Sequence, residues 1–450
     1  MSTLEKSTVD AQLSRLNDAW SSFHRRYPGD EGRRQPIHTV YGGAQIFKAE
    51  TGKKLGSIAL RSLEAYAPDA ATFAEALGLP GDAALHEKVY ARMRQKLERE
   101  AVEDFRIDFE DGYGNRSDEE EDGHAKSAAA EVARGMKEGT LPPFLGIRIK
   151  PLTPDLQARS VRTLDLFLST LLDASDNQLP ENFVVTLPKV GMPEEVEALS
   201  ALLSAIETKR GLDAGALKLE LMVETTQAIV APDGAFHLPR LVAAADGRCT
   251  GAHFGTYDYT ALYEVTARYQ GIAHPACDFA KHAMKVSLTG TGVMLSDGAT
   301  NIMPVPVHGR PKDGGELTDA QKNENRAAVY RAWRLHADHV RHALTGGFYQ
   351  GWDLHPAQLP VRYGATYAFF LEDLDVAGER LSNFIGKAAQ ATLAGDVFDD
   401  AATGQGLLNY FLRATSCGAI DMEEAVKRGG LTHAELESRS FLKILAGRKS

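Results

Sequence analysis

The chain has 450 residues, of which 43% are hydrophobic and 25% charged, and its formal net charge is −11. This is an ordinary globular composition, with enough length to bury a large core. The negative charge and the lack of a basic stripe argue against a nucleic-acid-binding protein. The scattered cysteines Cys249, Cys277 and Cys417 support neither a disulfide framework nor a cysteine-based zinc site.

Neither an export signal nor a membrane span is apparent. Residues 1–32 are polar and carry charges of both signs, without the apolar run of a secretory signal. The sequence has no stretch of 18 or more apolar residues, the length that a transmembrane helix needs. We therefore expect a cytoplasmic protein that binds neither membranes nor nucleic acid.

Short apolar or β-branched runs recur along the chain, separated by segments with helical spacing. Eight runs are predicted as strands: Pro36–Phe47, Asp104–Asp111, Phe144–Leu152, Asn182–Val190, Leu217–Thr225, Cys249–Asp258, Gly292–Thr300 and Phe348–Gln358. Alternating strands and helices predict an α/β protein with parallel strands joined by helical crossovers. Eight repeats of this unit favour a closed (β/α)8 TIM barrel over an open sheet.

Two extensions flank the predicted catalytic barrel of residues 35–390. Residues 1–34 form the N-terminal extension, expected to hold one helix and a lead-in. Residues 391–450 form a mostly helical C-terminal extension, in which Thr432 and Glu435 have the spacing of a helix capping box. This C-terminal part could cover the barrel mouth or make a subunit contact.

Charged residues gather toward the end of several predicted strands, where (β/α)8 enzymes carry their active sites. Glu224 and Asp258 end the fifth and sixth runs. Two carboxylates completed by water and substrate oxygens are the usual arrangement for Mg²⁺, so we expect these two residues to bind Mg²⁺ or Mn²⁺. The competing interpretation is that Glu224 forms a structural ion pair with Arg148 or Lys189, because structural ion pairs often resemble functional sites.

Other residues near strand ends are candidates for catalysis. The guanidinium of Arg148, in the third run, has donor geometry that suits a carboxylate. Its alternative role is a core salt bridge with Glu110 or Asp111, which end the second run. Lys189 follows a proline at the end of the fourth run and could simply extend its ammonium group to solvent.

Further residues are expected to line the pocket and bind substrate. Tyr41 and Gln45 lie at the end of the first run, Thr225 follows Glu224, Asp297 lies in the seventh run and His355 in the eighth. A hydrogen-bonded structural histidine is the competing interpretation of His355. The general acid or base stays open, because Asp297, His355 or a residue of another subunit could serve.

Seven short motifs follow one another between residues 104 and 358. They are Asp108-Phe109-Glu110-Asp111, Arg148, Pro188-Lys189, Glu224-Thr225, Gly255-Thr256-Tyr257-Asp258, Asp297-Gly298 and His355-Pro356-Ala357-Gln358. In order and type this series resembles the citrate lyase β-subunit and malyl-CoA lyase family of the phosphoenolpyruvate/pyruvate barrel superfamily. Lys150 replaces the asparagine of that family's R-x-N strand. Both ends of the chain are longer than in a compact β-subunit, which indicates a divergent branch.

The resemblance implies a particular chemistry for these residues. A metal ion held by Glu224 and Asp258 would act as a Lewis acid on a carboxylate and its neighbouring oxygen, and would stabilise an enolate. Arg148 would add positive charge at the same oxygens. Glu110 and Asp111 would orient metal-bound waters or Arg148.

Three functions compete on this basis. The first is a divalent-metal-dependent carbon–carbon lyase or aldolase acting on a 3-hydroxy acid, its thioester or an oxo acid. The second is phosphoryl transfer to or from an enolate on the same barrel, for which residues 307–315, with His308, Arg310 and Lys312, could cover a phosphate. The third is a non-catalytic accessory protein. The expected partners are a small carboxylate or acyl-thioester substrate and, by analogy with the family, further copies of the chain in a homo-oligomer.

Overall fold

Eight parallel strands close into a barrel, in which β1 pairs with both β2 and β8. The computed structural model describes residues 3–29, 31–309, 315–386, 392–394, 397–399 and 401–449. The strands are β1 His38–Gly43, β2 Asp104–Asp108, β3 Phe144–Arg148, β4 Phe183–Leu187, β5 Lys218–Val223, β6 Cys249–Phe254, β7 Met294–Ala299 and β8 Gln350–Asp353. Each lies within one of the eight predicted runs, which confirms the (β/α)8 fold.

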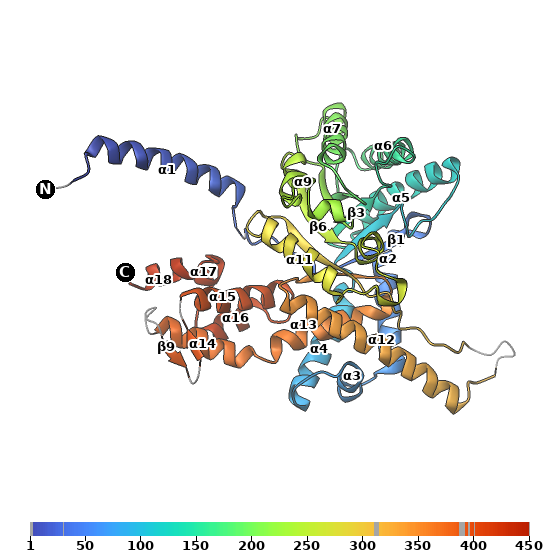
Figure 1. Ribbon diagram of the computed structural model, residues 1–450. Coiled ribbons are helices and arrows are strands. Elements are labelled where there is room, and N and C mark those ends of the chain that lie inside the picture. Colours follow the sequence, from blue (N-terminus) through green and yellow to red (C-terminus); the bar gives the residue numbers. More distant parts are fainter. Residues whose placement is uncertain are drawn as a thin grey trace.

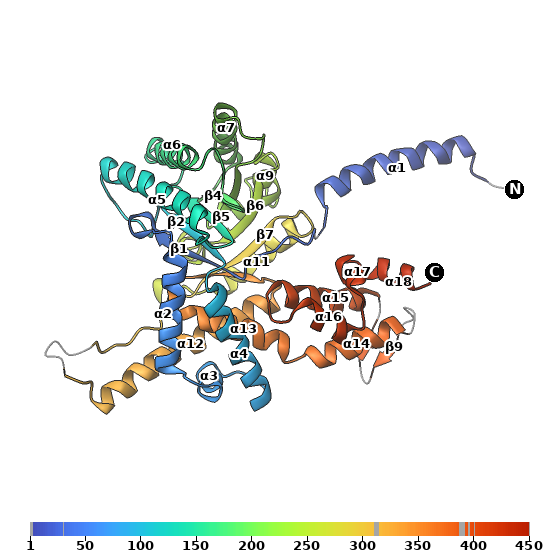
Figure 2. The same ribbon diagram turned by 180° about the vertical axis from the view of Figure 1, so that it is seen from behind.

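Helices follow the strands and surround the barrel (Figures 1 and 2). They are α2 Thr51–Tyr66, α3 Ala70–Leu77, α4 Ala83–Glu100, α5 Asp118–Glu138, α6 Gln157–Ala174, α7 Pro193–Arg210, α8 Thr226–Ile229, α9 Leu238–Ala244, α10 Thr256–Leu262, α11 Pro275–Leu288, α12 Asp319–Thr345 and α13 Leu359–Leu371. Local sequence explains several boundaries: Ser117 and Thr318 form capping boxes that begin α5 and α12. Gly139, in the left-handed region, ends α5.

The chain continues beyond the barrel at both ends. Helix α1, Lys6–Arg26, precedes it, and the C-terminal region consists of α14 Leu374–Gly386, β9 Thr392–Ala394, β10 Val397–Asp399, α15 Ala401–Ser416, α16 Met422–Gly429, α17 His433–Glu437 and α18 Phe441–Lys449. An N-terminal helix and a helical C-terminal extension are therefore confirmed. The predicted capping box of Thr432 and Glu435 begins α17. The domain boundaries at residues 34 and 390 stay a prediction.

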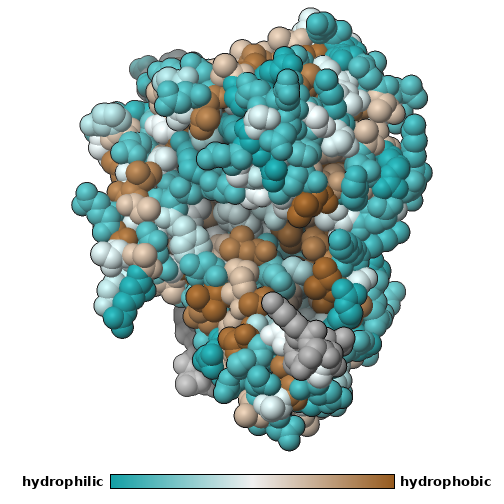
Figure 3. Space-filling model, turned by 90° about the vertical axis from the view of Figure 1, so that its right-hand side faces the viewer, coloured by the Kyte–Doolittle hydropathy of each residue, from teal (hydrophilic) through white to brown (hydrophobic). Residues whose placement is uncertain are grey.

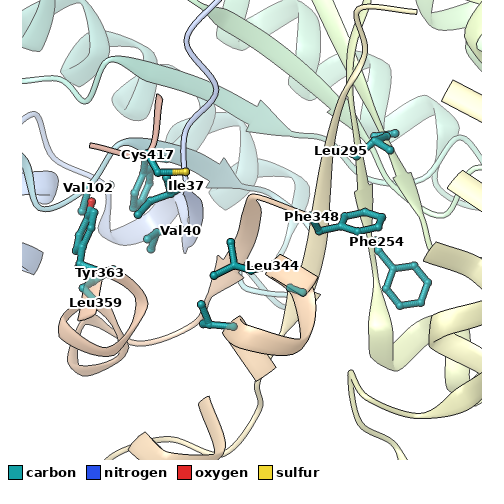
Figure 4. Packing of buried hydrophobic residues seen from close by; sticks show 14 of the residues in the cluster. Ile37, Val40, Val102, Phe254, Leu295, Leu344, Phe348, Leu359, Tyr363 and Cys417 are labelled. Atoms are coloured by element: carbon teal, nitrogen blue, oxygen red, sulfur yellow. The ribbon is translucent and has the colours of Figure 1, made fainter. Parts of the chain in front are cut away.

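The C-terminal helices share the hydrophobic core of the barrel. Cys417, at the end of α15, lies beside Ile37 and near Tyr363 of α13 (Figure 4). Arg413 of α15 donates a hydrogen bond to Gln35, which precedes β1, at 3.3 Å. These contacts place the C-terminal helices beside the N-terminal end of β1, and not over the C-terminal ends of the strands. In the described part of the chain, no helix is long and apolar enough to cross a membrane.

Charged side chains fill part of the barrel interior, where branched aliphatic residues usually dominate. Arg106 of β2 donates two hydrogen bonds of 2.7 Å to Glu220 of β5 and also contacts Asp104. His253 of β6 lies 3.2 Å from the Glu220 carboxylate. The carboxylates lower the electrostatic cost of burying the Arg106 guanidinium, because a buried charge is tolerated only when it is paired.

Buried histidines line the space between β8 and α12. His38 and His336 lie 3.3 and 3.0 Å from the two carboxylate oxygens of Asp353. Thr300 Oγ1 lies 2.9 Å from a ring nitrogen of both His336 and His339. Burial lowers the pKa of His38 to about 4, and the pKa of His339 likewise to about 4. These side chains are therefore neutral at physiological pH.

Acidification is expected to destabilise the fold through these histidines. Their pKa values are lower in the folded chain than in the unfolded chain, so the unfolded state binds more protons between about pH 4 and pH 6.5. Their stabilising contribution is complete above pH 6.5 and falls toward pH 4, by about 1.4 kcal/mol per pH unit for the fully buried His38. Urea denaturation at a series of pH values measures this slope.

The His38→Asn variant should flatten the dependence, whereas the exposed His433→Asn should not change it. A free energy of unfolding that stays constant between pH 6.5 and pH 4.5 would contradict this expectation.

Candidate functional site at the C-terminal mouth of the barrel

Four acidic residues from three strand ends meet around one lysine at the end of a fourth strand. Lys189 follows β4, and its Nζ contacts the carboxylate of Glu110, which follows β2. The same Nζ lies 3.3 Å from Asp111 Oδ2 and 3.5 Å from Asp258 Oδ2. Glu224, which follows β5, accepts a hydrogen bond of 2.7 Å from the backbone N–H of Lys189. Residues up to 148 positions apart in the sequence thus form one acidic cluster with a cation at its centre.

The Glu224 carboxylate is the most deeply placed acid of this cluster. Glu224 is 1% exposed. Its burial, opposed by the charges of Lys189 and Arg148 and reinforced by those of Asp258 and Glu110, raises its pKa to about 7. An acid whose pKa is shifted this far by burial and by named charged neighbours is typical of functional sites.

Lys189 has a strained backbone at this position. Its φ is +51°, in the left-handed region that costs a residue with a side chain about 1–2 kcal/mol. This conformation directs the backbone N–H toward Glu224 while Nζ reaches Glu110. Strain of this kind is concentrated at functional sites, and it agrees with a role for Lys189 in organising the cluster.

Arg148 is fixed at the end of β3 with one donor group unused. Its Nε donates to Asp108 Oδ1 at 2.7 Å, and Nη2 donates to Oδ2 of the same carboxylate. The guanidinium lies over the rings of Tyr41 and Trp352, at 4.9 and 5.6 Å. Nη1 lies 3.1 Å from Glu110 Oε2 but makes no hydrogen bond within the described part of the chain. A buried donor without an acceptor is costly, so this Nη1 is suited to an incoming anion.

The other residues expected near the pocket have different surroundings. The Tyr41 hydroxyl points into the barrel, 3.3 Å from His253 Nδ1. Gln45 follows β1, and its buried Oε1 has no hydrogen-bond partner among the described residues. Thr225 caps α8: its hydroxyl donates to Val190 O at 2.7 Å and accepts from the N–H of Ala228 at 3.0 Å.

Two predicted residues do not join the cluster around Lys189. Asp297 is buried, and its Oδ2 lies 3.3 Å from Lys281 Nζ of α11, on the outer side of β7. His355 follows β8 and accepts a hydrogen bond of 3.1 Å from the N–H of Ala357, which caps the short helix Pro356–Gln358. The contacts of Asp297 and His355 are those of structural residues.

Sequence reasoning did not assign a site role to Asp108 or Trp352. Asp108 holds two of the guanidinium nitrogens of Arg148, and its place at the start of the D-x-E-D motif was the available signal. Trp352 packs 4.3 Å from the Tyr41 ring, and nothing in the sequence around it distinguishes it from a core residue.

The donors of this mouth suit a hard divalent cation. No group of three or more His, Cys, Asp or Glu side chains encloses a metal position in the ranges that the structure describes. Mg²⁺, however, commonly takes only one or two carboxylates and completes its shell with water and substrate. Glu224 and Asp258 supply two carboxylates after the neighbouring strands β5 and β6, and carboxylate oxygens suit such an ion. The Lys189 ammonium, 3.5 Å from Asp258 Oδ2, would compete with the ion for that carboxylate.

The loop after β7 is described only in part. His308 contacts Glu324 of α12, and its N–H donates to Asn325 at 2.7 Å. Arg310 and Lys312 lie outside the described residues. Figure 3 views the side toward which this loop extends in Figure 1, and the surface there is hollowed near its centre with hydrophobic side chains around the hollow.

Segments that follow strands, helical ones included, also expose apolar side chains. Ile46 after β1 and Leu262 after β6 are 70% and 56% exposed. Met192 after β4 and Leu354 after β8 are 51% and 37% exposed. The C-terminal mouth thus combines a buried charged centre with an apolar periphery.

One solved structure supports the fold of this chain, and others are more distantly similar. No functionally curated protein has a matching sequence. A citrate lyase from Burkholderia xenovorans is similar in structure, with a TM-score of 0.52 and 20% identity over 78% of this chain and 94% of that one. CitE from Mycobacterium tuberculosis, in complex with magnesium, acetoacetate and coenzyme A, matches with a TM-score of 0.46 and 15% identity, covering 89% and 99% of the two chains. Haloferax volcanii malate synthase matches with a TM-score of 0.43 and 13% identity, covering 90% and 96%.

At 20% identity, the likeness to the Burkholderia enzyme is a likeness of fold and leaves the reaction open. The sequence itself matches one family over most of its length. Residues 16–444 fit the family described as Domain of unknown function (DUF6986), and the chain belongs to that family.

Proposed function

We propose that this protein is a carbon–carbon lyase or aldolase that depends on Mg²⁺ or Mn²⁺ and acts on a 3-hydroxy acid, its thioester or an oxo acid. The observation that carries the proposal is the meeting of Glu224, Asp258 and Lys189 at one barrel mouth, beside an arginine with an unused donor. The ordered strand-end motifs support the same reaction class, and so does the fold shared with a citrate lyase.

Each residue has a role in this proposal. Glu224 and Asp258 would hold the divalent ion, which supplies a Lewis acid for a substrate carboxylate and its neighbouring oxygen. Arg148, oriented by Asp108, would bind the substrate carboxylate through Nη1. Lys189 would balance the negative charge of the site and position Glu224 through its backbone N–H.

Glu110 occupies the place where a substrate anion is expected. Its carboxylate contacts Lys189 Nζ and lies 3.1 Å from Arg148 Nη1. The Glu110 side chain is only 7% exposed, so an incoming carboxylate would have to displace it from Arg148. Glu110 would then be free to orient water or substrate. Asp111, whose side chain is 60% exposed at the rim of the barrel, would move with it.

The direct test is turnover of substrates from the three classes. Purified protein, stripped of metal and resupplied with Mg²⁺ or Mn²⁺, is incubated with 3-hydroxy acids, their coenzyme A thioesters and 2-oxo acids, and cleavage or condensation products are followed by NMR. Metal-dependent product formation is expected.

Two other outcomes would overturn the proposal. Thermal stabilisation by phosphoenolpyruvate or a nucleotide, without a response to any of the three classes, would favour phosphoryl transfer. A folded protein that binds neither metal ion in calorimetry would favour an accessory role.

Gly255 offers a further check on the position of Glu224. A Cβ at residue 255 would lie 2.4 Å from Glu224 Oε2 and 2.5 Å from Glu224 Cβ, so the glutamate must move in the Gly255→Ala variant. We expect the affinity for Mn²⁺, measured by calorimetry, to fall by at least about 10-fold, since shifts in groups that orient ligands cost this much.

Gly191→Ala is the matched control, because a Cβ there meets nothing within 4 Å and the residue follows β4 at the same mouth. Equal affinities of the two variants would place the metal away from Glu224.

A further inference from the structure

Helix α1 projects away from the rest of the molecule (Figures 1 and 2). It has 21 residues, and none of them is buried. After the helix, the N–H of Gly29 donates to Gly290 O at 2.9 Å, which is a contact with the body of the molecule. The side chains of α1 are therefore in contact with one another and with solvent, within the described part of the chain.

The apolar residues of α1 form one continuous stripe. They follow the alternating spacing of four and three residues that is typical of a coiled-coil seam: Val9, Leu13, Leu16, Trp20 and Phe23, continued by Tyr27, which caps the helix. Leu13, Leu16, Trp20 and Phe23 are 48–52% exposed. The rings of Trp20 and Phe23 pack at 5.4 Å, and those of Phe23 and Tyr27 at 4.9 Å. The stripe is a preformed hydrophobic face.

A helix in this situation requires a partner. Helices in proteins gain most of their stability by burying an apolar face against a neighbouring element. Serine, threonine and asparagine make up much of the remainder of α1, and these residues are poor helix formers. The described chain leaves these six apolar positions uncovered. We therefore expect the helix to bury them against another polypeptide.

We propose that α1 pairs antiparallel with α1 of a second copy of this chain. The charges at the two ends of the helix favour that orientation. Glu5 and Asp10 outweigh Lys6 at the N-terminal end, which is therefore weakly acidic, whereas the last turn carries His24, Arg25 and Arg26. Antiparallel pairing brings each acidic end next to a basic end, while parallel pairing places like charges together. The helix dipoles also favour the antiparallel arrangement.

One register fills every layer of the seam with apolar side chains. Leu16 of one copy lies opposite Trp20 of the other, Leu13 opposite Phe23, and Val9 opposite Tyr27. Each contact occurs twice, because a two-fold axis passes beside residue 18. Such a self-complementary surface is what a two-fold symmetric dimer requires.

The first test is the mass of the particle in solution. Sedimentation velocity of the wild-type chain should give an even multiple of 48.9 kDa. Leu16→Asp places a charge at the centre of the seam and should raise the dissociation constant of the α1 pair by at least about tenfold. Ser14→Asp introduces the same charge on the opposite face and should leave the mass unchanged. Because no residue of α1 is buried, neither variant should change the unfolding temperature of the barrel.

Cysteine cross-linking tests the orientation. Asn17→Cys lies beside the two-fold axis and should form a disulfide between two copies on mild oxidation. Lys6→Cys should not, because antiparallel pairing separates its two copies by about 36 Å along the helices. The chain already contains Cys249, Cys277 and Cys417, of which the last two are buried. Oxidising the wild-type chain in parallel shows whether any of these forms a disulfide between copies.

A wild-type monomer would overturn the proposal, and so would a cross-link through residue 6 in place of residue 17. Leu16→Asp with an unchanged mass and no cross-link at residue 17 would show that α1 docks on another surface, which also contradicts it.

Discussion

Replacing Asp258 with asparagine, or Glu224 with glutamine, is expected to remove divalent-cation binding and metal-dependent turnover while the barrel stays folded. Both substitutions keep the size of the side chain and remove one negative charge. Changes to residues that merely support metal ligands cost 10–100-fold, so the loss of a ligand should lower Mn²⁺ affinity and kcat/KM by at least about 100-fold. Calorimetry and a product assay measure the two effects separately.

The stability of the two variants provides an independent control. Glu224 is 1% exposed and burial raises its pKa, so its charged form weakens the fold at neutral pH and Glu224→Gln should unfold no earlier than the wild-type chain. Asp258 is 38% exposed, and its loss should hardly change the unfolding temperature. Asp173→Asn removes a surface carboxylate and should leave metal binding intact. Normal Mn²⁺ affinity in both site variants would refute the metal assignment.

The fold could be predicted from the sequence because its strands are short, apolar and evenly interspersed with helices. The predicted runs continue past the strands, mainly at their C-terminal ends. The run Leu217–Thr225 continues past β5, which ends at Val223, because the charged residues that follow it were included with the strand. Thr225 instead caps α8. The site residues therefore lie just after the strands, where each strand passes into the following loop.

The direction of a side chain could not be predicted in the same way. Strands of a parallel barrel are buried on both faces and so lack the alternation that separates inside from outside. Asp297 was therefore expected in the pocket, although it faces Lys281 outside β7. The pairing of Arg106 with Glu220 joins residues 114 positions apart and exists only because the barrel closes. Nothing local in either segment specifies it.

Replacing Arg106 with leucine is expected to cause the largest loss of stability, because it leaves two acids inside the barrel without their cation. Arg106 binds Glu220 through two hydrogen bonds and contacts Asp104, and all three residues are at most 3% exposed. Removing one member of a buried ion pair costs about 3–5 kcal/mol. A cavity of about 500 Å³ borders these residues from the N-terminal end of the strands and gives water a route to the acids, so we expect the lower end of that range, to be measured by urea denaturation.

Burial, and not the number of ion pairs, determines how much stability is lost with Arg106. Arg134 on α5 has three acidic partners, but its side chain is 39% exposed, and Arg134→Leu should lower the free energy of unfolding far less than Arg106→Leu does. If uncompensated charge is the cause, combining Arg106→Leu with Asp104→Asn and Glu220→Gln should recover part of the lost stability, because the neutral amides need no cation. A triple variant no more stable than Arg106→Leu alone would show that the barrel depends on the shape of the arginine and not on its charge.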